Sequence, residues 1–142
     1  MKESQVKKTF LALWLGSLLF CLATPAEAQK VYRVGSLNTA EQFADAFEGF
    51  KSRMAELGYR EGQNVRYDFY NAKGSEEALN NFARKMVQDK VDLIVTSSTS
   101  ATVAAARATQ GANIPVVFLS AGNPQRVVKS FASSGSNLAG IS

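Results

Sequence analysis

Short runs of β-forming residues alternate with longer segments whose apolar residues recur at helical spacing, and this alternation continues from residue 31 to the end of the chain. Two of the runs are almost wholly apolar, which is typical of parallel strands buried on both faces. The alternation predicts an α/β fold in which one parallel sheet carries helices on both faces, joined by right-handed crossovers. The expected strands are Val31–Leu37, Val65–Tyr70, Val91–Thr96, Ile114–Leu119 and Leu138–Ser142.

The first helix is expected to begin at Thr39, because Thr39-Ala40-Glu41-Gln42 has the order of a capping box. Gly58 is expected to end this helix in the left-handed conformation. An aromatic stripe at helical spacing indicates a core-facing surface rather than an aromatic ligand box. The stripe consists of Phe43, Phe47, Phe50, Met54 and Leu57.

Three further helices are expected along the chain. Ser75 is expected to cap the second helix, since acidic residues fill the turn that follows it. The third helix is expected at Ala101–Thr109, and a short fourth helix from Pro124 to about Ala132. The second helix has its own apolar stripe, which consists of Leu79, Phe82, Ala83, Met86 and Val87.

Residues 1–28 have the composition of a secretory signal peptide. A basic start precedes the uncharged run Thr9–Ala23, and Ala26-Glu27-Ala28 follows as a cleavage site. One alternative is a transmembrane helix, which needs ~20 apolar residues. Another is a lipoprotein anchor at Cys21, although the bulky Phe20 stands where a small residue is expected. We therefore expect an exported protein, periplasmic or otherwise extracytoplasmic, whose mature domain is residues 29–142.

The composition excludes several kinds of site. The sequence has no histidine, which removes the commonest general base and most zinc sites, so no metal or cofactor is expected. Three of the 16 basic residues and two of the 12 acidic residues precede residue 29, so the mature domain carries a net charge of +3. This mild charge is not gathered into a basic run, so nucleic-acid binding is not expected. The mature domain has no cysteine and depends on an ordinary core without disulfides.

Polar residues follow three of the expected strands, at the positions where α/β sheets bind ligands. In the loop 97–100, four hydroxyl residues lead directly into a helix, and the free N–H groups at a helix start attract a carboxylate or phosphate. The alternative is that Ser98 or Thr99 only caps the helix, and capping does not exclude binding. The candidate ligand-binding residues are Ser36, Asn38, Thr39, Ser97, Ser98, Thr99, Ser100, Ser120 and Asn123.

The sequence lacks the motifs of several common enzyme and nucleotide-binding classes. It has no GxGxxG after the first strand, no GxxxxGK(S/T) and no GxSxG. Asp68 and Asp92 are expected to be isolated acids at a ladder edge or facing solvent, rather than a catalytic pair. A hydroxyl-rich pocket without a base favours holding a ligand over transforming it, so we expect no catalytic residue and no enzyme.

A series of short motifs resembles the substrate-binding protein family of ABC transporters that includes tryptophan- and tyrosine-binding members. The motifs follow one another in the family's order behind a signal peptide, and the resemblance covers residues 31–142. They are Leu57-Gly58-Tyr59, Glu61-Gly62-Gln63-Asn64, Asn71-Ala72-Lys73-Gly74, Val91-Asp92-Leu93-Ile94-Val95, Ile114-Pro115-Val116-Val117-Phe118, Asn123-Pro124 and Gly135-Ser136-Asn137-Leu138-Ala139-Gly140.

The resemblance implies one lobe of a type-one periplasmic-binding-protein fold. In that family two α/β lobes close on a small organic ligand such as an amino acid, and the closed form docks on a membrane permease. The sequence contains only the first of these lobes, so the resemblance implies a truncated N-terminal lobe without its second lobe. Thr99 matches a family threonine, while Ser100 replaces the usual proline and Asn123 replaces the usual aspartate.

Two alternatives to this function stay open from the sequence. One is a stand-alone exported sensing or interaction module with the same fold. The other is a gene fragment without function.

Overall fold

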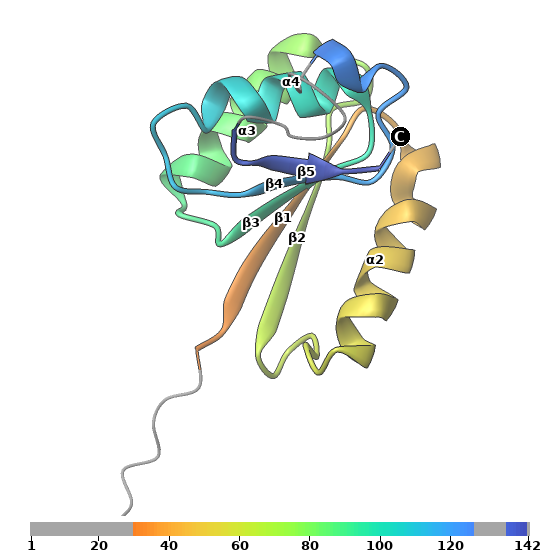
Figure 1. The fold of residues 1–142 in the computed structure, drawn as a ribbon, viewed down its shortest axis with the longest axis vertical. Helices are drawn as coiled ribbons and strands as arrows, with labels where there is room; N and C mark the ends of the chain where they lie inside the picture. The colour runs from red at the N-terminus through yellow and green to blue at the C-terminus, as the bar shows by residue number, and fades with distance from the viewer. Residues whose placement is uncertain (1–29, 127–135, 142) are drawn as a thin grey trace, which may run out of the picture.

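Five parallel strands form one sheet in the order β2-β1-β3-β4-β5. The computed structural model describes residues 30–126 and 136–141 of the chain (Figure 1). The predicted parallel α/β sheet is therefore confirmed, and the strand bounds differ from the predicted ones by at most two residues at either end. The strands are β1 (Tyr32–Asn38), β2 (Val65–Asn71), β3 (Leu93–Thr96), β4 (Val116–Phe118) and β5 (Leu138–Gly140).

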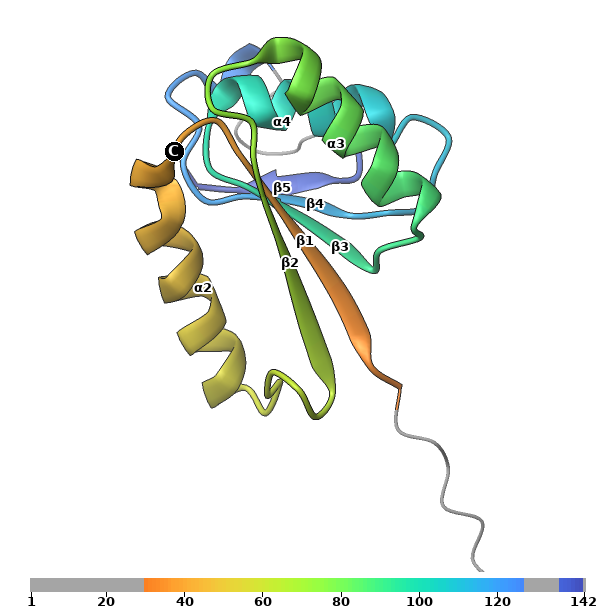
Figure 2. The same cartoon turned by 180° about the vertical axis from the view of Figure 1, so that it is seen from behind.

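Helices cover both faces of the sheet, as predicted (Figure 2). Helix α2 (Ala44–Glu56) lies on one face, while α3 (Glu76–Gln88) and α4 (Thr99–Ala108) lie together on the other. Two short 3-10 turns, η2 (Glu41–Phe43) and η3 (Pro124–Arg126), complete the described elements. Within residues 30–126 and 136–141, no helix combines the length and the apolar character that a membrane span requires.

The larger of two cores lies between the sheet and the α3–α4 pair. The α3 stripe faces this core, with Leu79, Ala83 and Met86 fully buried, which confirms the predicted apolar face of that helix. Small side chains on the inner face of α4 allow its backbone to lie close to the strands. The fully buried members from α4 and the sheet include Ala101, Ala104, Ala105, Leu37, Ile94 and Val116.

The second core lies between the sheet and α2, and it depends on one aromatic residue. Phe47 is the one fully buried residue of α2, and its ring centre lies 6.0 Å from that of Phe50 and 5.7 Å from that of Tyr67. The prediction that Leu57 faces the core was wrong, because α2 ends at Glu56 and the Leu57 side chain is 58% exposed. The α2 core is therefore narrower than the predicted stripe.

Within residues 30–126 and 136–141, no helix covers the α2 side of the sheet at the last two strands. Val116 and Leu138 are paired neighbours in β4 and β5, and both are buried under the α3–α4 side. The next pair, Val117 and Ala139, points to the α2 side, where Val117 is half-buried and Ala139 is exposed. The described helices thus cover one face of the sheet more completely than the other.

The chain enters its first helix differently from the prediction. Ala40 precedes η2 with no side-chain capping bond, and α2 begins only at Ala44, so the capping-box prediction at Thr39 was wrong. The Thr39 carbonyl instead accepts a hydrogen bond from the Gly74 amide at 2.8 Å, which ties the loops after β1 and β2 together. Gly58 has a φ of +92° just after the helix end, as predicted.

Serine side chains cap the other two helices. The Ala78 amide donates to Ser75 Oγ at 3.1 Å, as predicted, and the Ala101 amide donates to Ser98 Oγ at 3.2 Å. Because Ser98 is the cap, α4 begins two residues before its predicted start. The predicted helix from Pro124 is a 3-10 turn as far as Arg126, and its remainder lies outside the described residues, as does the predicted signal peptide.

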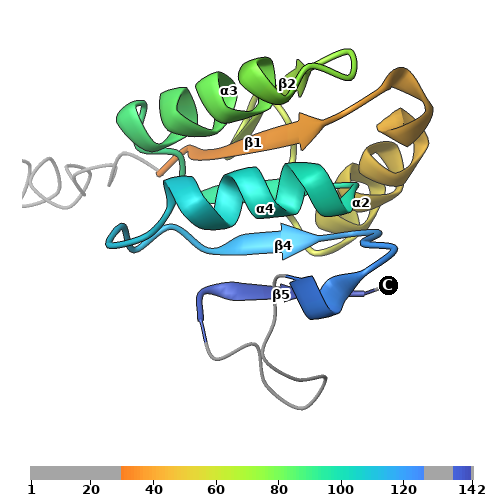
Figure 3. The same cartoon turned by 90° about the horizontal axis from the view of Figure 1, so that it is seen from above.

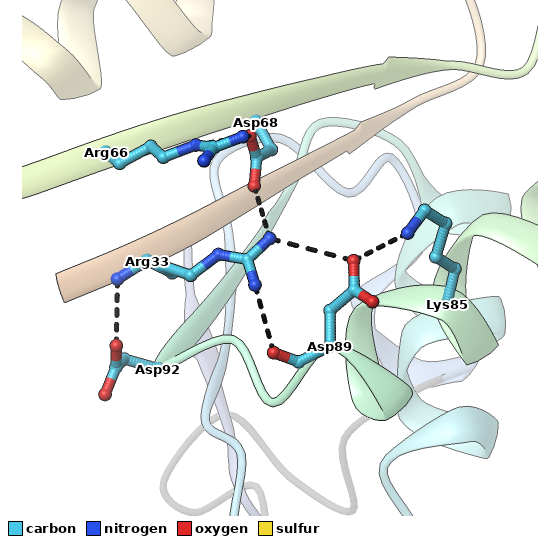
Figure 4. A network of polar contacts seen from close by, with 6 residues as sticks. All are labelled: Arg33, Arg66, Asp68, Lys85, Asp89 and Asp92. Atoms are coloured by element: carbon cyan, nitrogen blue, oxygen red, sulfur yellow. Dashed lines mark hydrogen bonds and ion pairs between the residues drawn. The ribbon is translucent and has the colours of Figure 1, made fainter.

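Arg33 joins the acidic side chains near the amino ends of the strands into one network (Figure 4). Its guanidinium donates to Asp68 Oδ2 at 3.0 Å and to the Asp89 carbonyl at 3.1 Å, and its backbone amide donates to Asp92 Oδ2 at 2.8 Å. Asp68 also pairs with Arg66, at 3.1 Å. The prediction that Asp68 and Asp92 are isolated acids was therefore wrong, because strand pairing brings Arg33 between them.

The network lowers the pKa of its three carboxyl groups. Partial burial raises the pKa of Asp68, but hydrogen bonds from Arg33 and Arg66 outweigh it, and the net pKa lies below the usual value. The hydrogen bond from Lys85 lowers the pKa of Asp89, and the hydrogen bond from Lys30 lowers that of Asp92. All three groups therefore favour the folded state in their ionised form.

We predict that acidification destabilises the fold through this network. A carboxyl group with a lowered folded pKa contributes stability above its unfolded pKa of about 3.9, and this contribution disappears as the pH falls through the folded pKa. In Arg33→Met, the free energy of unfolding is expected to be lower at pH 7 and to decrease less between pH 6 and pH 3 than in the wild type. Urea denaturation at stepped pH measures both effects.

The control for this series is Arg53→Met, which removes an exposed arginine of α2 that pairs with Glu56. Its pH profile is expected to run parallel to that of the wild type. Equal slopes for Arg33→Met and the wild type would contradict the assignment of the acid sensitivity to the Arg33 network.

Gly140 lies where β5 pairs with β4, and the pairing leaves no room for a side chain. A Cβ at this position would overlap the carbonyl oxygen and the ring of Phe118, its paired neighbour. Gly49 in α2 is the opposite case, since a Cβ there would meet nothing within 4 Å.

We predict opposite effects for alanine at these two glycines. Gly140→Ala is expected to lower the free energy of unfolding by about 1–3 kcal/mol, because β4 and β5 have to separate to admit the methyl group. Gly49→Ala is expected to raise it by about 0.5–1 kcal/mol, because alanine is the better helix former. Urea denaturation measures both values, and a Gly140→Ala protein as stable as the wild type would show that β5 is not held as described.

Candidate ligand-binding site

The carboxyl ends of the parallel strands meet at one edge of the sheet, and two central strands bring the polar loops together there. β1 pairs with both β2 and β3, so the order of the strands reverses beside it. Figure 3 shows the arrowheads of β1 and β4 pointing to the same side of the molecule. Ligands of open α/β sheets bind at such a reversal point, outside the carboxyl ends of the strands.

Asn38 and Ser97 become neighbours at this point. Leu37 and Thr96 are the last paired residues of β1 and β3, and Asn38 and Ser97 directly follow them. Both side chains are fully buried. Neighbouring strands thus place an amide and a hydroxyl side by side at the reversal point.

Buried hydrogen bonds support the edge on both faces of the sheet. The Asn38 amide group donates to Ser36 Oγ at 2.8 Å. Thr102 Oγ1 donates to the Ser98 carbonyl at 2.7 Å and lies 2.8 Å from Thr96 Oγ1. Since Thr102 has a single hydroxyl proton, Thr96 is the donor between the two threonines. These bonds fix the end of β3 to the first turn of α4.

Two buried polar atoms at the ends of β1 and β3 have no hydrogen-bond partner within the described residues. They are Asn38 Oδ1 and Ser97 Oγ. A buried polar atom without a partner costs about 1–3 kcal/mol, so such atoms are rare and call for an explanation. The edge thus has unused hydrogen-bonding capacity at the place where the strand order reverses.

The first turn of α4 adds hydrogen-bond donors to this edge of the sheet. Ser98 Oγ accepts the hydrogen bond of the Ala101 amide, whereas the amides of Thr99 and Ser100 come too early in the helix to have an acceptor within it. The helix dipole adds a partial positive charge at this end. The arrangement suits a carboxylate or phosphate oxygen.

The loop after β4 is tied to the same turn. The Asn123 amide donates to Thr99 Oγ1 at 3.2 Å, and the Leu119 amide donates to the Thr96 carbonyl at 2.8 Å. Thr99 uses an oxygen lone pair in this contact, so its hydroxyl proton is free for another acceptor. The structure therefore brings the second and third predicted loops together.

The nine predicted site residues differ in their exposure. All nine lie at the carboxyl edge of the sheet, which the β1–β3 and β3–β4 pairings assemble. Ser36, Asn38 and Ser97 have no exposed surface, so they contact a ligand only if the loops above them move. The other six are half-buried or exposed and are Thr39, Ser98, Thr99, Ser100, Ser120 and Asn123.

The predicted site residues carry no formal charge. The acidic network around Arg33 lies at the opposite end of the strands, and the described residues hold no group of three or more acidic, histidine or cysteine side chains that suits a metal ion. Hydroxyl and amide groups donate and accept hydrogen bonds but do not act as bases at neutral pH. The edge can therefore bind a polar ligand and orient it.

The prediction from sequence missed a cavity beside this edge. Thr39 and Ser100 belong to its lining, together with Glu76, Arg107 and Arg126. No motif in the sequence marks the two arginines. Arg107 follows Ser100 by seven residues, which corresponds to two helical turns on one face, and this spacing is the one signal that was available.

The sequence of this chain matches the model of a known protein family. Residues 39–142 match the model of the family described as ABC transporter substrate binding protein. The match begins directly after β1 and includes every later strand and helix. The chain belongs to this family. The resemblance stated from the sequence motifs is thereby confirmed.

Individual relatives agree with the family match. The chain is 32% identical over 121 residues to a tyrosine-binding protein from Clostridioides difficile (strain R20291), covering 84% of this chain and 34% of that protein. A Vibrio cholerae conserved domain protein superposes with a TM-score of 0.74 at 29% identity, over 80% of this chain and 39% of that one. An ABC domain from Streptococcus pneumoniae, solved in complex with L-Trp, superposes with a TM-score of 0.71 at 26% identity, over 79% of this chain and 38% of that one.

The structural relatives also define the fold class. The five-stranded sheet with its helices is one lobe of the type-one periplasmic-binding-protein fold. The chain spans between about a third and two-fifths of the length of the relatives described above. These relatives therefore extend well beyond the part that this chain matches.

Proposed function

We propose that this chain forms one side of the ligand cleft of an exported substrate-binding protein, and that the ligand is an amino acid with an aromatic side chain. The observation that carries this proposal is the pair of free α4 amides, at Thr99 and Ser100, above the buried Asn38–Ser97 pair at the reversal point of the sheet. Family membership supports the binding role.

The hydrogen-bonding groups of the edge match the common part of an α-amino acid. The ligand carboxylate accepts hydrogen bonds from the Thr99 and Ser100 amides and from the Thr99 hydroxyl, whose proton is free. Asn38 Oδ1 is an acceptor, which suits an ammonium group rather than a second anion. A neutral edge suits a ligand whose own charges cancel.

The aromatic side chain is proposed from the relatives. One relative is a tyrosine-binding protein, and another was solved in complex with L-Trp. In this chain the half-buried and exposed residues of the edge would contact the ligand. They include Ser98, Thr99, Ser100, Ser120 and Asn123. Ser36, Asn38 and Ser97 would support the cleft from beneath, and they would touch the ligand directly only after a shift of the covering loops.

The remaining parts of the proposal concern the setting of the cleft. The relatives extend well beyond this chain, so a second lobe in the complete protein would cover the ligand from the other side, and the closed form would deliver it to an ABC permease. The apolar run of residues 9–23, with its basic start, supports export. Binding without catalysis is proposed because the predicted site residues carry no formal charge.

A stand-alone exported interaction module is the second candidate function. The open face of β4 and β5, where Val117 is half-buried and Ala139 exposed, is the observation that favours it. This alternative predicts that the chain recruits a protein partner and binds no amino acid.

We predict that the purified chain binds L-tyrosine and L-tryptophan measurably by isothermal titration calorimetry, and glycine not at all. One side of a cleft encloses less of the ligand than the 70–90% usual for binding pockets, so the dissociation constants are expected near the millimolar range. Thr99→Val is expected to weaken binding about tenfold to a hundredfold, which corresponds to the loss of a hydrogen bond to a charged group worth about 1.5–3 kcal/mol.

Ser52→Ala is the matched control, because Ser52 is an exposed hydroxyl residue of α2, outside the predicted site. It is expected to bind both ligands like the wild type. The proposal fails if none of the amino acids produces heat of binding, or if Thr99→Val and Ser52→Ala bind equally well.

A further inference from the structure

A groove runs along the outer side of α3 and α4, next to the carboxyl edge of the sheet. Figure 3 shows the two helices side by side. The cavity in this groove has a volume of about 300 Å³, which lies at the small end of the range for ligand pockets. Its lining comes from both helices, from η3 and from the loops after β1 and β2.

Two arginines line this cavity together. Arg107 comes from the last turn of α4 and Arg126 from η3, and both also line an adjacent cavity of about 270 Å³ that includes Gln110. The two residues thus border the same two neighbouring cavities, although they are 19 positions apart in the sequence. Two exposed basic residues thus share one region of the surface.

Neither arginine has a hydrogen-bond or ion-pair partner for its side chain within residues 30–126 and 136–141. Three other arginines are paired with carboxylates, whereas Arg84 donates to the Asn81 side chain and Arg60 has no side-chain partner within the described residues. Arg33 and Arg66 bind Asp68, and Arg53 binds Glu56. Two neighbouring cations without a counter-ion repel each other, and an anion placed between them removes this repulsion. Arg107 and Arg126 differ from the unpaired Arg60 because the two of them line the same cavities.

The acidic residue of the lining stands toward the other end of the groove. Glu76 begins α3, and both helices run in the same direction, since each returns the chain between parallel strands. Ser100 lies in the first turn of α4, and Arg107 follows it by seven residues, or roughly 10 Å along the helix. Glu76 therefore lines the end of the groove near Ser100, and Arg107 lines the other end.

We propose that Arg107 and Arg126 form a binding site for a small ligand that carries a phosphate or carboxylate group. The planar guanidinium group binds either anion through two parallel hydrogen bonds, and two such groups from different elements can hold one anion between them. The Gln110 amide, which lines the adjacent cavity, supplies a further neutral donor. The cavity shares Thr39 and Ser100 with the proposed amino-acid site, but the two arginines take no part in that proposal, so the inference holds even if that proposal fails.

The test uses inorganic phosphate and succinate as probes, titrated into the purified chain by isothermal titration calorimetry at constant ionic strength. Saturable binding of at least one probe is expected, and the preferred probe distinguishes a phosphate ligand from a carboxylate ligand. The double variant Arg107→Gln/Arg126→Gln is expected to weaken that binding at least tenfold. Each single variant is expected to lie between the double variant and the wild type, because the two groups bind one anion.

The matched control is Arg60→Gln/Arg84→Gln, which removes the same charge from two exposed arginines outside the cavity. This double variant is expected to bind the probes like the wild type. A second control, Thr99→Val, alters the proposed amino-acid site and is also expected to leave probe binding unchanged. The proposal is overturned if neither probe binds saturably, or if the two double variants weaken binding equally. The second result would show a general effect of net charge.

Discussion

The parallel pairing of β1 with β3 is the contact on which the rest of the structure depends. Both strands contribute to both cores, with Leu37 and Ile94 on the α3–α4 side and Val34 and Val95 on the α2 side. The same pairing also brings polar residues together at each end of the sheet. At the amino end it places Arg33 against Asp92, and at the carboxyl end it brings Asn38 beside Ser97.

Along the paired strands, charged side chains lie at the amino end and neutral polar side chains lie at the carboxyl end. The acids of the sheet meet basic partners at the amino end and are satisfied there, as Figure 4 shows. The carboxyl edge receives hydroxyl and amide groups, and the free amides of α4 add a partial positive charge. A ligand with both an ammonium and a carboxylate group finds complementary partners at such an edge. The strand register therefore links the stability of the lobe to its proposed binding function.

Much of the fold could be predicted from the sequence, because the governing signals are local. The apolar runs that became β3 and β4 show burial on both faces, and Ser75 and Gly58 mark helix ends by their own conformational preferences. The predictions failed where distant contacts decide the outcome. Thr39 matches a capping motif but is held by Gly74 from another loop, and Asp68 and Asp92 looked isolated because their common partner Arg33 lies far away in the sequence.

The candidate site was predictable to a similar degree. The rule that ligands bind beyond the carboxyl ends of parallel strands selected loops that the sheet does bring together at one edge. The rule could not show that Ser36, Asn38 and Ser97 are buried beneath that edge, because burial depends on how the loops close over it. It also could not find Arg107 and Arg126, since their proximity arises only when η3 packs against α4.

The central claim is that a ligand binds at the start of α4, above the Asn38–Ser97 pair. The most direct measurement is a two-dimensional nitrogen–proton NMR titration of the isotopically labelled chain with L-tyrosine. The largest shifts are expected at the amides of residues 97–100, with smaller shifts at 38–39 and 120–123 and none around Arg33. Shifts centred on the amino end of the strands, or no shifts at saturating ligand, would contradict the claim.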